Sequence, residues 1–407
     1  MQRDGRFRWL AGFRAGMVAI LACAVVCTLT YANYHFASRN PGGNDFLPRW
    51  AGTRLYLTEG LSPYGSQASA EIQRMIYGRQ AIVGEDQSLF VYPFYSIPLF
   101  APFSLISDYS VARAAWMLVL ELCILWLAWV GVSLSKCRPS PLALGGLVLF
   151  GAFWYHNVRS VINGNPALLC GAFIAAVLLA LRDRRDMLAG FLLALATFKP
   201  QMVVLLVPLA LFWAFSLQRW RFFWSIVVGV LVLLTTSSVI LPGWIVPAIE
   251  QITAYPDYTL PGTPASIFTA WWGDSGRILG GLLTAALVIL LASEWWKVRG
   301  KDFAGFMWTV FLTLAATNLI GVRTATDNFS ALYPALILII ATWVRRPEGT
   351  WARLVMVSMP ALLVGMWILF LSSLQDGAVE HGIMFFPLPL LTIAGLYTIR
   401  RRMVDVI

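Results

Sequence analysis

Charged residues are scarce in this chain. They make up 12% of its 407 residues, against about 25% in an ordinary soluble protein, while 59% of the residues are hydrophobic. No soluble core could hide that much apolar surface. The composition therefore excludes a soluble globular protein and predicts a single membrane-embedded, all-α bundle over residues 1–407.

Cysteine and histidine are also rare. The five cysteines lie almost entirely in apolar runs and none lies in a long hydrophilic stretch, which excludes a disulfide framework. His35, His156 and His381 are scattered, whereas a metal centre needs ligands close together. We therefore expect no metal and no cofactor.

The excess of basic residues, a net charge of +10, does not form a stripe. Short clusters separate the apolar runs, a pattern typical of cytoplasmic loops and not of nucleic-acid binding, so no nucleic-acid partner is expected. The clusters are Arg3/Arg6/Arg8/Arg14, Lys136/Arg138, Arg182/Arg184/Arg185, Arg219/Arg221, Lys297/Arg299/Lys301, Arg345/Arg346 and Arg400/Arg401/Arg402.

Apolar runs between helix breakers predict 13 membrane segments, where a full span needs about 20 residues. Both ends of the chain are basic and are therefore predicted to be cytoplasmic. A chain with both ends on one side crosses the membrane an even number of times, here about 12. The segments are 17–36, 92–107, 109–134, 141–156, 163–181, 187–198, 201–217, 221–241, 275–296, 303–320, 329–344, 351–373 and 384–399.

Two topologies restore an even number of crossings. Segment 92–107, with its three prolines, can dip into the membrane and return, which keeps every basic cluster on one side. Alternatively, 187–198 and 201–217 form one helix kinked at Lys199-Pro200. Both topologies place 37–91 and 242–274 in extracytoplasmic loops.

The first of these loops is predicted to be structured. Asn44-Asp45 can cap a helix over 46–59 that ends at Gly60, and Ser66 can cap a second helix over 67–77. The second helix has an apolar stripe, so we expect both helices to lie on the membrane surface.

Asp45 is the strongest candidate for chemistry, because a carboxylate at the membrane face can accept a proton from a sugar hydroxyl. Arg49, four residues on, can bind a phosphate through two hydrogen bonds. The alternatives are that Asp45 only caps its helix and that Arg49 only pairs with Asp45 or anchors to lipid headgroups.

Further candidates lie between later apolar runs. Lys199 suits a lipid-linked phosphate or merely snorkels to the surface. Arg323 can bind substrate or pair locally with Asp327. The remaining candidates are Asn163 and Asn165, which offer amides to sugar hydroxyls or form a plain turn, and Tyr92, which can stack on a sugar or anchor the chain at the interface.

Five segments follow one another in a characteristic order. They are Asn-Asp-Phe-Leu-Pro-Arg-Trp-Ala-Gly (44–52), Glu-Gly-Leu-Ser-Pro-Tyr (59–64), Phe-Val-Tyr-Pro-Phe-Tyr (90–95), Asn-Gly-Asn-Pro-Ala-Leu-Leu (163–169) and Ala-Gly-Phe-Leu-Leu-Ala-Leu-Ala-Thr-Phe-Lys-Pro (189–200). Together they resemble glycosyltransferase family 87, the DUF2029 group, which includes polyprenol-phosphate-mannose-dependent α-mannosyltransferases. The resemblance implies a GT-C fold in which an acidic residue of the first outer loop is the catalytic base. Asp45 is the matching position.

The same resemblance implies a polyprenyl-phosphate sugar donor, with mannose as the hexose, and a lipid- or glycan-linked acceptor. The enzyme would be a multi-pass protein of the cell membrane, embedded in the lipid bilayer, with its active site on the extracytoplasmic face. Arg49, Lys199 and Arg323 would stabilise the leaving phosphate, and transfer would invert the anomeric centre. A membrane transporter or lipid flippase is the alternative class, and it predicts inverted repeats, which are not visible in the chain.

Overall fold

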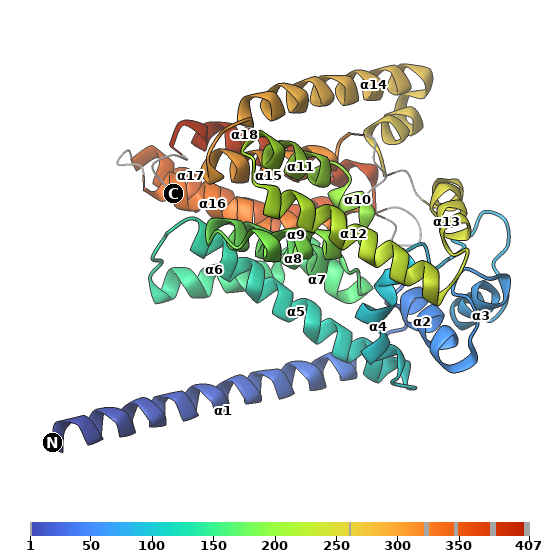
Figure 1. Ribbon diagram of the computed structural model, residues 1–407, viewed down its shortest axis with the longest axis horizontal. Coiled ribbons are helices and arrows are strands. Elements are labelled where there is room, and N and C mark those ends of the chain that lie inside the picture. Colours follow the sequence, from blue (N-terminus) through green and yellow to red (C-terminus); the bar gives the residue numbers. More distant parts are fainter. Residues whose placement is uncertain (1, 260–261, 321–324, 346–348, 375–379, 403–407) are drawn as a thin grey trace.

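The computed structural model describes residues 2–259, 262–320, 325–345, 349–374 and 380–402. Within these ranges the protein is helical and has no β-strand (Figure 1). The first half contains α1 (Gln2–Arg39), α2 (Leu47–Glu59), α3 (Ser66–Tyr77), η1 (Phe94–Ser96), α4 (Ile97–Ser104), α5 (Tyr109–Leu134), α6 (Pro141–Phe153), α7 (Tyr155–Asn163), α8 (Ala167–Arg182), α9 (Asp186–Ala196) and α10 (Pro200–Val203). The second half contains α11 (Leu206–Ser216), α12 (Trp220–Ile240), α13 (Ile245–Tyr258), α14 (Pro264–Val298), α15 (Phe303–Thr317), η2 (Thr326–Leu332), α16 (Tyr333–Val344), α17 (Gly349–Ser373), η3 (Gly382–Phe385), α18 (Pro387–Ile399) and η4 (Arg400–Arg402).

Seven helical segments of the described chain are long and apolar enough to cross a membrane, and an eighth is possible if the bent pair α7 and α8 counts as one span. Helices α6, α9, α11 and α15 are apolar but shorter. The all-α, polytopic fold class is confirmed. The expected number of about 12 crossings is reached only if the shorter helices also cross.

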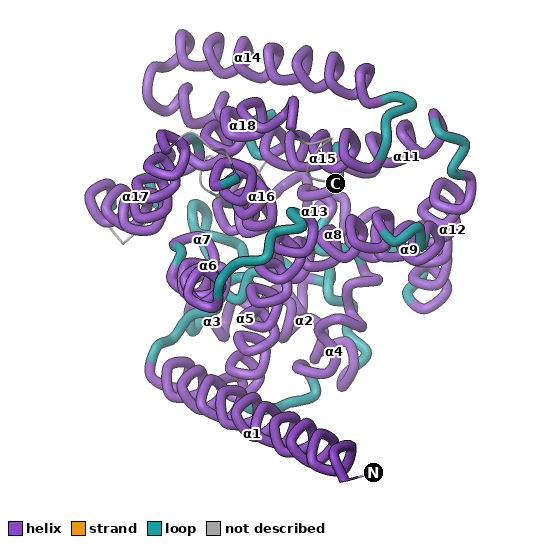
Figure 2. The backbone as a smooth tube through the Cα atoms, turned by 90° about the vertical axis from the view of Figure 1, so that its left-hand side faces the viewer, coloured by secondary structure: helices purple, strands orange, loops and turns teal. Residues whose placement is uncertain are grey.

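The helices divide into a buried centre and a lipid-facing periphery. Helices α15 and α16 are buried along almost their whole length, and α5 and α8 pack around them. Helices α1 and α14 lie at opposite edges of the bundle (Figure 2). Peripheral helices such as α12 expose rows of Val and Leu side chains, which is a stable arrangement only where lipid covers them.

The basic clusters gather at one end of the bundle. Arg182 at the end of α8 donates to Ser133 Oγ at 2.7 Å, and Arg345 after α16 donates to the Ser135 carbonyl at 2.7 Å. Arg219 after α11 forms an ion pair with Asp186 at the start of α9. The chain therefore reverses between α9 and α11, and the alternative in which 187–198 and 201–217 form one kinked helix is wrong.

Segment 92–107 does not cross the bundle. Its helix α4 has eight residues, about 12 Å at 1.5 Å per residue, against a membrane core of about 30 Å. The Trp50 indole of α2 donates to the Phe103 carbonyl at 3.1 Å, and Arg54 donates to the Ser104 carbonyl at 3.0 Å. The segment therefore lies on α2 and returns, as the first of the two topologies expects.

The first long loop contains the two expected helices, α2 and α3, which gather with α13 at the end of the bundle opposite the basic clusters (Figure 1). Gly60 ends α2 in the left-handed conformation, with φ of 68°. The expected caps are wrong. Asp45 and Ser66 make no capping hydrogen bond, and the first amides of α2 instead bond to the Gly43 carbonyl, at 2.8 Å from both Phe46 N and Leu47 N.

The second long loop contains α13 and the first turns of α14, which begins at Pro264 because Thr263 and Ser266 form a reciprocal capping box there. The helical path breaks at Trp272 and Gly273, and the turns before the break fold back so that Ala265 lies against Gly280. The break is close to the expected end of the loop 242–274.

Candidate active site

A cavity of about 300 Å³ lies at the end of the bundle that carries α2 and α13. Its wall comes from the first loop, the breaks before α8 and α10, helix α13 and the segment that begins η2. The lining residues are Asp45, Arg49, Val91, Tyr92, Asn165, Lys199, Pro200, Gln201, Val204, Ile252, Tyr255, Pro256, Ala325 and Asn328.

Asp45 is held by the turn between α7 and α8. Its backbone N–H donates to the Asn163 carbonyl at 3.1 Å, and its Oδ2 accepts from the Asn165 side-chain amide at 3.0 Å. Within the described chain, no hydrogen bond reaches the other oxygen, Oδ1. Asp45 thus presents one fixed and one available carboxylate oxygen at the cavity.

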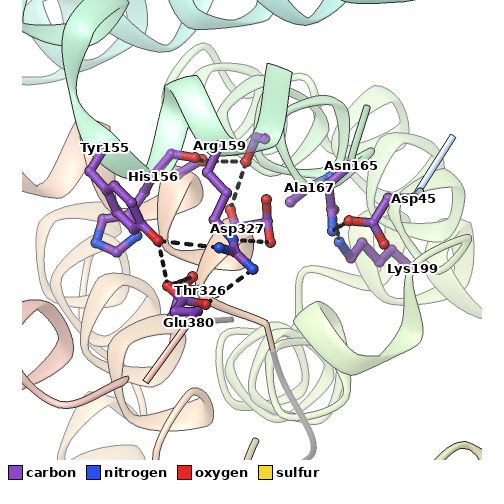
Figure 3. Close-up of polar contacts among 12 residues, drawn as sticks. Asp45, Tyr155, His156, Arg159, Asn165, Ala167, Lys199, Thr326, Asp327 and Glu380 are labelled. Carbon is purple, nitrogen blue, oxygen red and sulfur yellow. Dashed lines mark hydrogen bonds and ion pairs between the residues drawn. The ribbon is translucent and has the colours of Figure 1, made fainter. Parts of the chain in front are cut away.

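Asn165 joins Asp45 to Lys199 (Figure 3). Its side-chain oxygen accepts from the Ala167 backbone N–H at 3.0 Å and from the Lys199 ammonium. These two donors fix the orientation of the amide, so its NH2 group must face Asp45. Lys199 is 1% exposed and reaches the cavity because the chain breaks between α9 and α10 at Pro200.

Arg49 is a second buried cation on this wall. It is 6% exposed, and its guanidinium lies 4.4 Å from the centre of the Tyr92 ring. No ion pair of Arg49 occurs in the described ranges, and its Nε lacks a hydrogen-bond partner there. A buried cation with unmet donors beside a second cation is suited to binding an anion.

The chain before Asp45 is fixed by two side chains of α5. The guanidinium of Arg113 donates to the Asn40 carbonyl at 2.7 Å and to the Ile162 carbonyl at 2.9 Å. Tyr109 donates to the carbonyls of Gly42 and Gly43 at 3.0 and 3.2 Å. Arg113 therefore ties the segment before Asp45 to the turn that carries Asn163 and Asn165.

A buried ionic cluster, absent from the sequence-based hypotheses, lies next to the cavity. Arg159 of α7 pairs with Asp327 at 3.3 Å and with Glu380 at 3.2 Å. Tyr155 and Thr326 both donate to Glu380, at 2.8 and 2.6 Å (Figure 3). The cluster anchors η2, which carries Asn328 at the cavity wall. The sequence-based alternative paired Asp327 with Arg323. In the structure Asp327 pairs with Arg159.

Two further carboxylates of the first loop do not line the cavity. Glu85 pairs with Arg79 at 2.6 Å, and this hydrogen-bonded pair, with the Ile82 N–H, lowers the pKa of Glu85 to about 2. Desolvation in the loop raises the pKa of Asp86, although its side chain stays partly in solvent, and the Asp45 charge adds to this rise. Asp86 thus lies within electrostatic range of Asp45.

The structure brings five of the seven sequence-predicted site residues to one cavity: Asp45, Arg49, Tyr92, Asn165 and Lys199. Asn163 contributes its backbone carbonyl, which holds Asp45. Arg323 lies outside the described residues. Gln201, Tyr255 and Asn328 also line the cavity. Gln201 follows Lys199-Pro200 directly and could have been suspected, whereas nothing in the sequence marks Tyr255.

The family model of glycosyltransferase family 87 matches residues 90–369, more than half of the chain. The chain belongs to glycosyltransferase family 87. No curated protein and no solved structure matches it significantly. With its apolar helices, this glycosyltransferase is a multi-pass membrane protein, and a transporter or flippase is not supported.

The family match covers Tyr92, Asn165, Lys199 and, of the buried ionic cluster, Arg159 and Asp327 but not Glu380. It begins after Asp45 and Arg49, so the roles of these two residues depend on their geometry in this glycosyltransferase and not on the match.

Proposed function

We propose that this glycosyltransferase transfers a hexose, with mannose as the first candidate, from a polyprenyl-phosphate donor to a lipid- or glycan-linked acceptor. The single observation that carries the proposal is the cavity wall on which two buried cations, Arg49 and Lys199, stand beside a carboxylate, Asp45. The cations suit a phosphate and the carboxylate suits an acceptor hydroxyl.

The phosphate of the donor is the leaving group, and it already carries charge before the bond breaks. It needs electrostatic stabilisation and no protonation. Arg49 can donate two parallel hydrogen bonds from a guanidinium that stacking on Tyr92 holds in place. Lys199 is fixed by Asn165 and supplies a compact second charge as the leaving group gains negative charge.

Asp45 is the general base. Its free Oδ1 accepts the proton of the acceptor hydroxyl while that oxygen attacks the anomeric carbon, and the sugar–phosphate bond breaks in line on the opposite side. One displacement of this kind inverts the anomeric centre. The neutral side chains of Gln201 and Tyr255 on the same wall suit the hydroxyls of an uncharged hexose.

The test is transfer from radiolabelled polyprenyl-phosphate sugars, offered one at a time to membranes that contain the protein. We expect transfer from a polyprenyl-phosphate hexose by the wild type, and transfer at least about 10²-fold slower by membranes with Asp45→Asn. Transfer from a nucleotide sugar, with every polyprenyl-phosphate sugar inactive, would overturn the proposal.

We further propose that the cavity faces the extracytoplasmic side of the cell membrane, since the basic clusters lie at the other end of the bundle and mark the cytoplasmic side. Single cysteines that replace Val83, in the first loop, and Asp183, beside the basic clusters, test this. In intact cells an impermeant thiol reagent should label position 83 and not position 183. The reverse labelling pattern would contradict the orientation.

A further inference from the structure

Part of the cavity wall is apolar, and it comes from two elements that meet there. Val204 follows α10, and Ile252 and Pro256 belong to α13. The polar side of the wall is almost fully buried, with Asn165 at 4% and Lys199 at 1% exposure. Val204 and Ile252 are 45% and 40% exposed, so the cavity is open at this apolar pair.

Helix α13 continues the apolar surface away from this opening. Ile245, Ile249 and Ile252 recur at the spacing of one helix face, and all are at least 40% exposed. The opposite face is fastened to the first loop, because Gln251 accepts from the Val91 N–H at 3.1 Å and donates to the Tyr64 carbonyl at 3.2 Å. An amphipathic helix held in this way at the end of a membrane bundle places its apolar face against lipid.

We propose that the isoprenoid chain of the donor leaves the cavity between Val204 and Ile252 and lies along the apolar face of α13. This inference rests on the proposed function. A phosphate at Arg49 and Lys199 places the sugar inside a cavity of about 300 Å³, which has no room for a long chain as well. The chain must remain in apolar surroundings, and within the described cavity wall the exposed apolar pair Val204 and Ile252 offers such a path.

Photo-crosslinking tests the position of the chain directly. A photoreactive benzophenone side chain replaces Ile252 in one variant and Ile240 in the control. Ile240, at the end of α12, is 54% exposed but does not line the cavity. With a radiolabelled polyprenyl-phosphate hexose, we expect a crosslink at position 252 that excess unlabelled donor abolishes. Equal, non-competable labelling at both positions would overturn the inference.

Kinetics with a bulky side chain gives an independent result. Ile252→Trp narrows the opening, whereas Ile240→Trp adds the same bulk elsewhere on the lipid-facing surface. We expect the KM for the polyprenyl-phosphate donor to rise roughly tenfold or more in Ile252→Trp, a loss of the size that overpacking of a site typically causes, with Ile240→Trp unchanged. Unchanged kinetics in Ile252→Trp would count against this path. Wild-type protein that uses no polyprenyl-phosphate donor would instead refute the proposed function, which keeps the two failures apart.

Discussion

The side-chain amide of Asn165 donates to Asp45 at 3.0 Å, and the oxygen of the same amide accepts from Lys199. One neutral side chain therefore sets the positions of a carboxylate and an ammonium that have different proposed tasks. Because the Ala167 N–H also bonds to this amide, helix α8 fixes its orientation. The base and the cation at the phosphate thus share one rigid support.

Asp45→Asn tests the proposed base. Asparagine keeps the size of the side chain and an oxygen that can accept from Asn165, but it cannot take a proton. We expect transfer to fall by about 10²-fold or more, the usual contribution of a general base, with normal membrane insertion and thermal stability. Glu71→Gln, which removes a partly exposed carboxylate from α3 outside the cavity, is the matched control and should stay active. Activity above about a tenth of wild type in Asp45→Asn would reject the assignment.

Lys199→Met separates a catalytic role from a structural one. Methionine fills the space of the lysine stem and removes a charge that is 1% exposed. Lys199 is bonded to the neutral side chain of Asn165 and not to a carboxylate, so its replacement breaks no buried ion pair, and we expect little loss of stability. We expect kcat to fall by about 10²-fold, as on loss of a group that stabilises the charge of a transition state. The melting temperature in detergent should stay within a few degrees of wild type. A large drop in the melting temperature with an unchanged kcat would indicate that Lys199 has a structural role only.

Arg49→Lys tests the shape of the cation. Lysine keeps the charge but loses the planar group that stacks on Tyr92 and can donate two parallel hydrogen bonds. We expect the donor KM to rise about tenfold or more, equivalent to about 1.4 kcal/mol. The control is Arg54→Lys on the same helix, where the arginine donates to the Ser104 carbonyl outside the cavity. An equal rise in KM in both variants would show that the effect comes from α2 and not from the phosphate.

Much of the fold could be predicted from the sequence, because a lipid-embedded chain must pair its backbone groups within helices and cover them with apolar side chains. The helices of the first loop are also predicted nearly to the residue, since Gly60 must end one of them. Their caps are not. Asp45 is free of capping because the Gly43 carbonyl and the Asn163 carbonyl hold the backbone around it, and no local pattern shows those contacts.

The site was predictable where its residues are unusual for their surroundings. Lys199 between apolar runs and Asp45 at the edge of the first span are examples. The Arg159–Asp327–Glu380 cluster was not predictable, because Arg159 and Asp327 are 168 residues apart and each reads as an ordinary loop or helix-end residue. Such pairs depend on how the helices pack, which spacing along the chain does not encode.

Arg159→Met tests what this cluster contributes. Removing Arg159 leaves Asp327, which is 1% exposed, without its ion-pair partner. Breaking a buried pair from one side typically costs about 3–5 kcal/mol, and we expect the lower end because Arg159 itself is partly open to solvent. Thermal unfolding in detergent should show this loss. The double variant with Asp327→Asn should recover part of it, and failure to do so would mean that the ion pair is not the source of the stability.

Gly164→Ala tests how closely the base must be placed. Gly164 ends α7 with φ of 67°, and a Cβ there would lie 2.5 Å from the Cβ of Phe46, the residue directly after Asp45. Gly60 has nearly the same φ, 68°, but open space around it. Both alanine variants carry the left-handed backbone cost of about 1–2 kcal/mol, so a difference between them measures the contacts of the new methyl group with Phe46 and Trp116. We expect both variants to lose a similar amount of stability from the backbone strain. Only Gly164→Ala should lose transfer activity, by about 10²-fold, because the new methyl group displaces Asp45, and displacing a catalytic group by about 1 Å has that effect. Equal activity in the two variants would show that the position of Asp45 tolerates such a shift, and general-base catalysis from this position would then be hard to maintain.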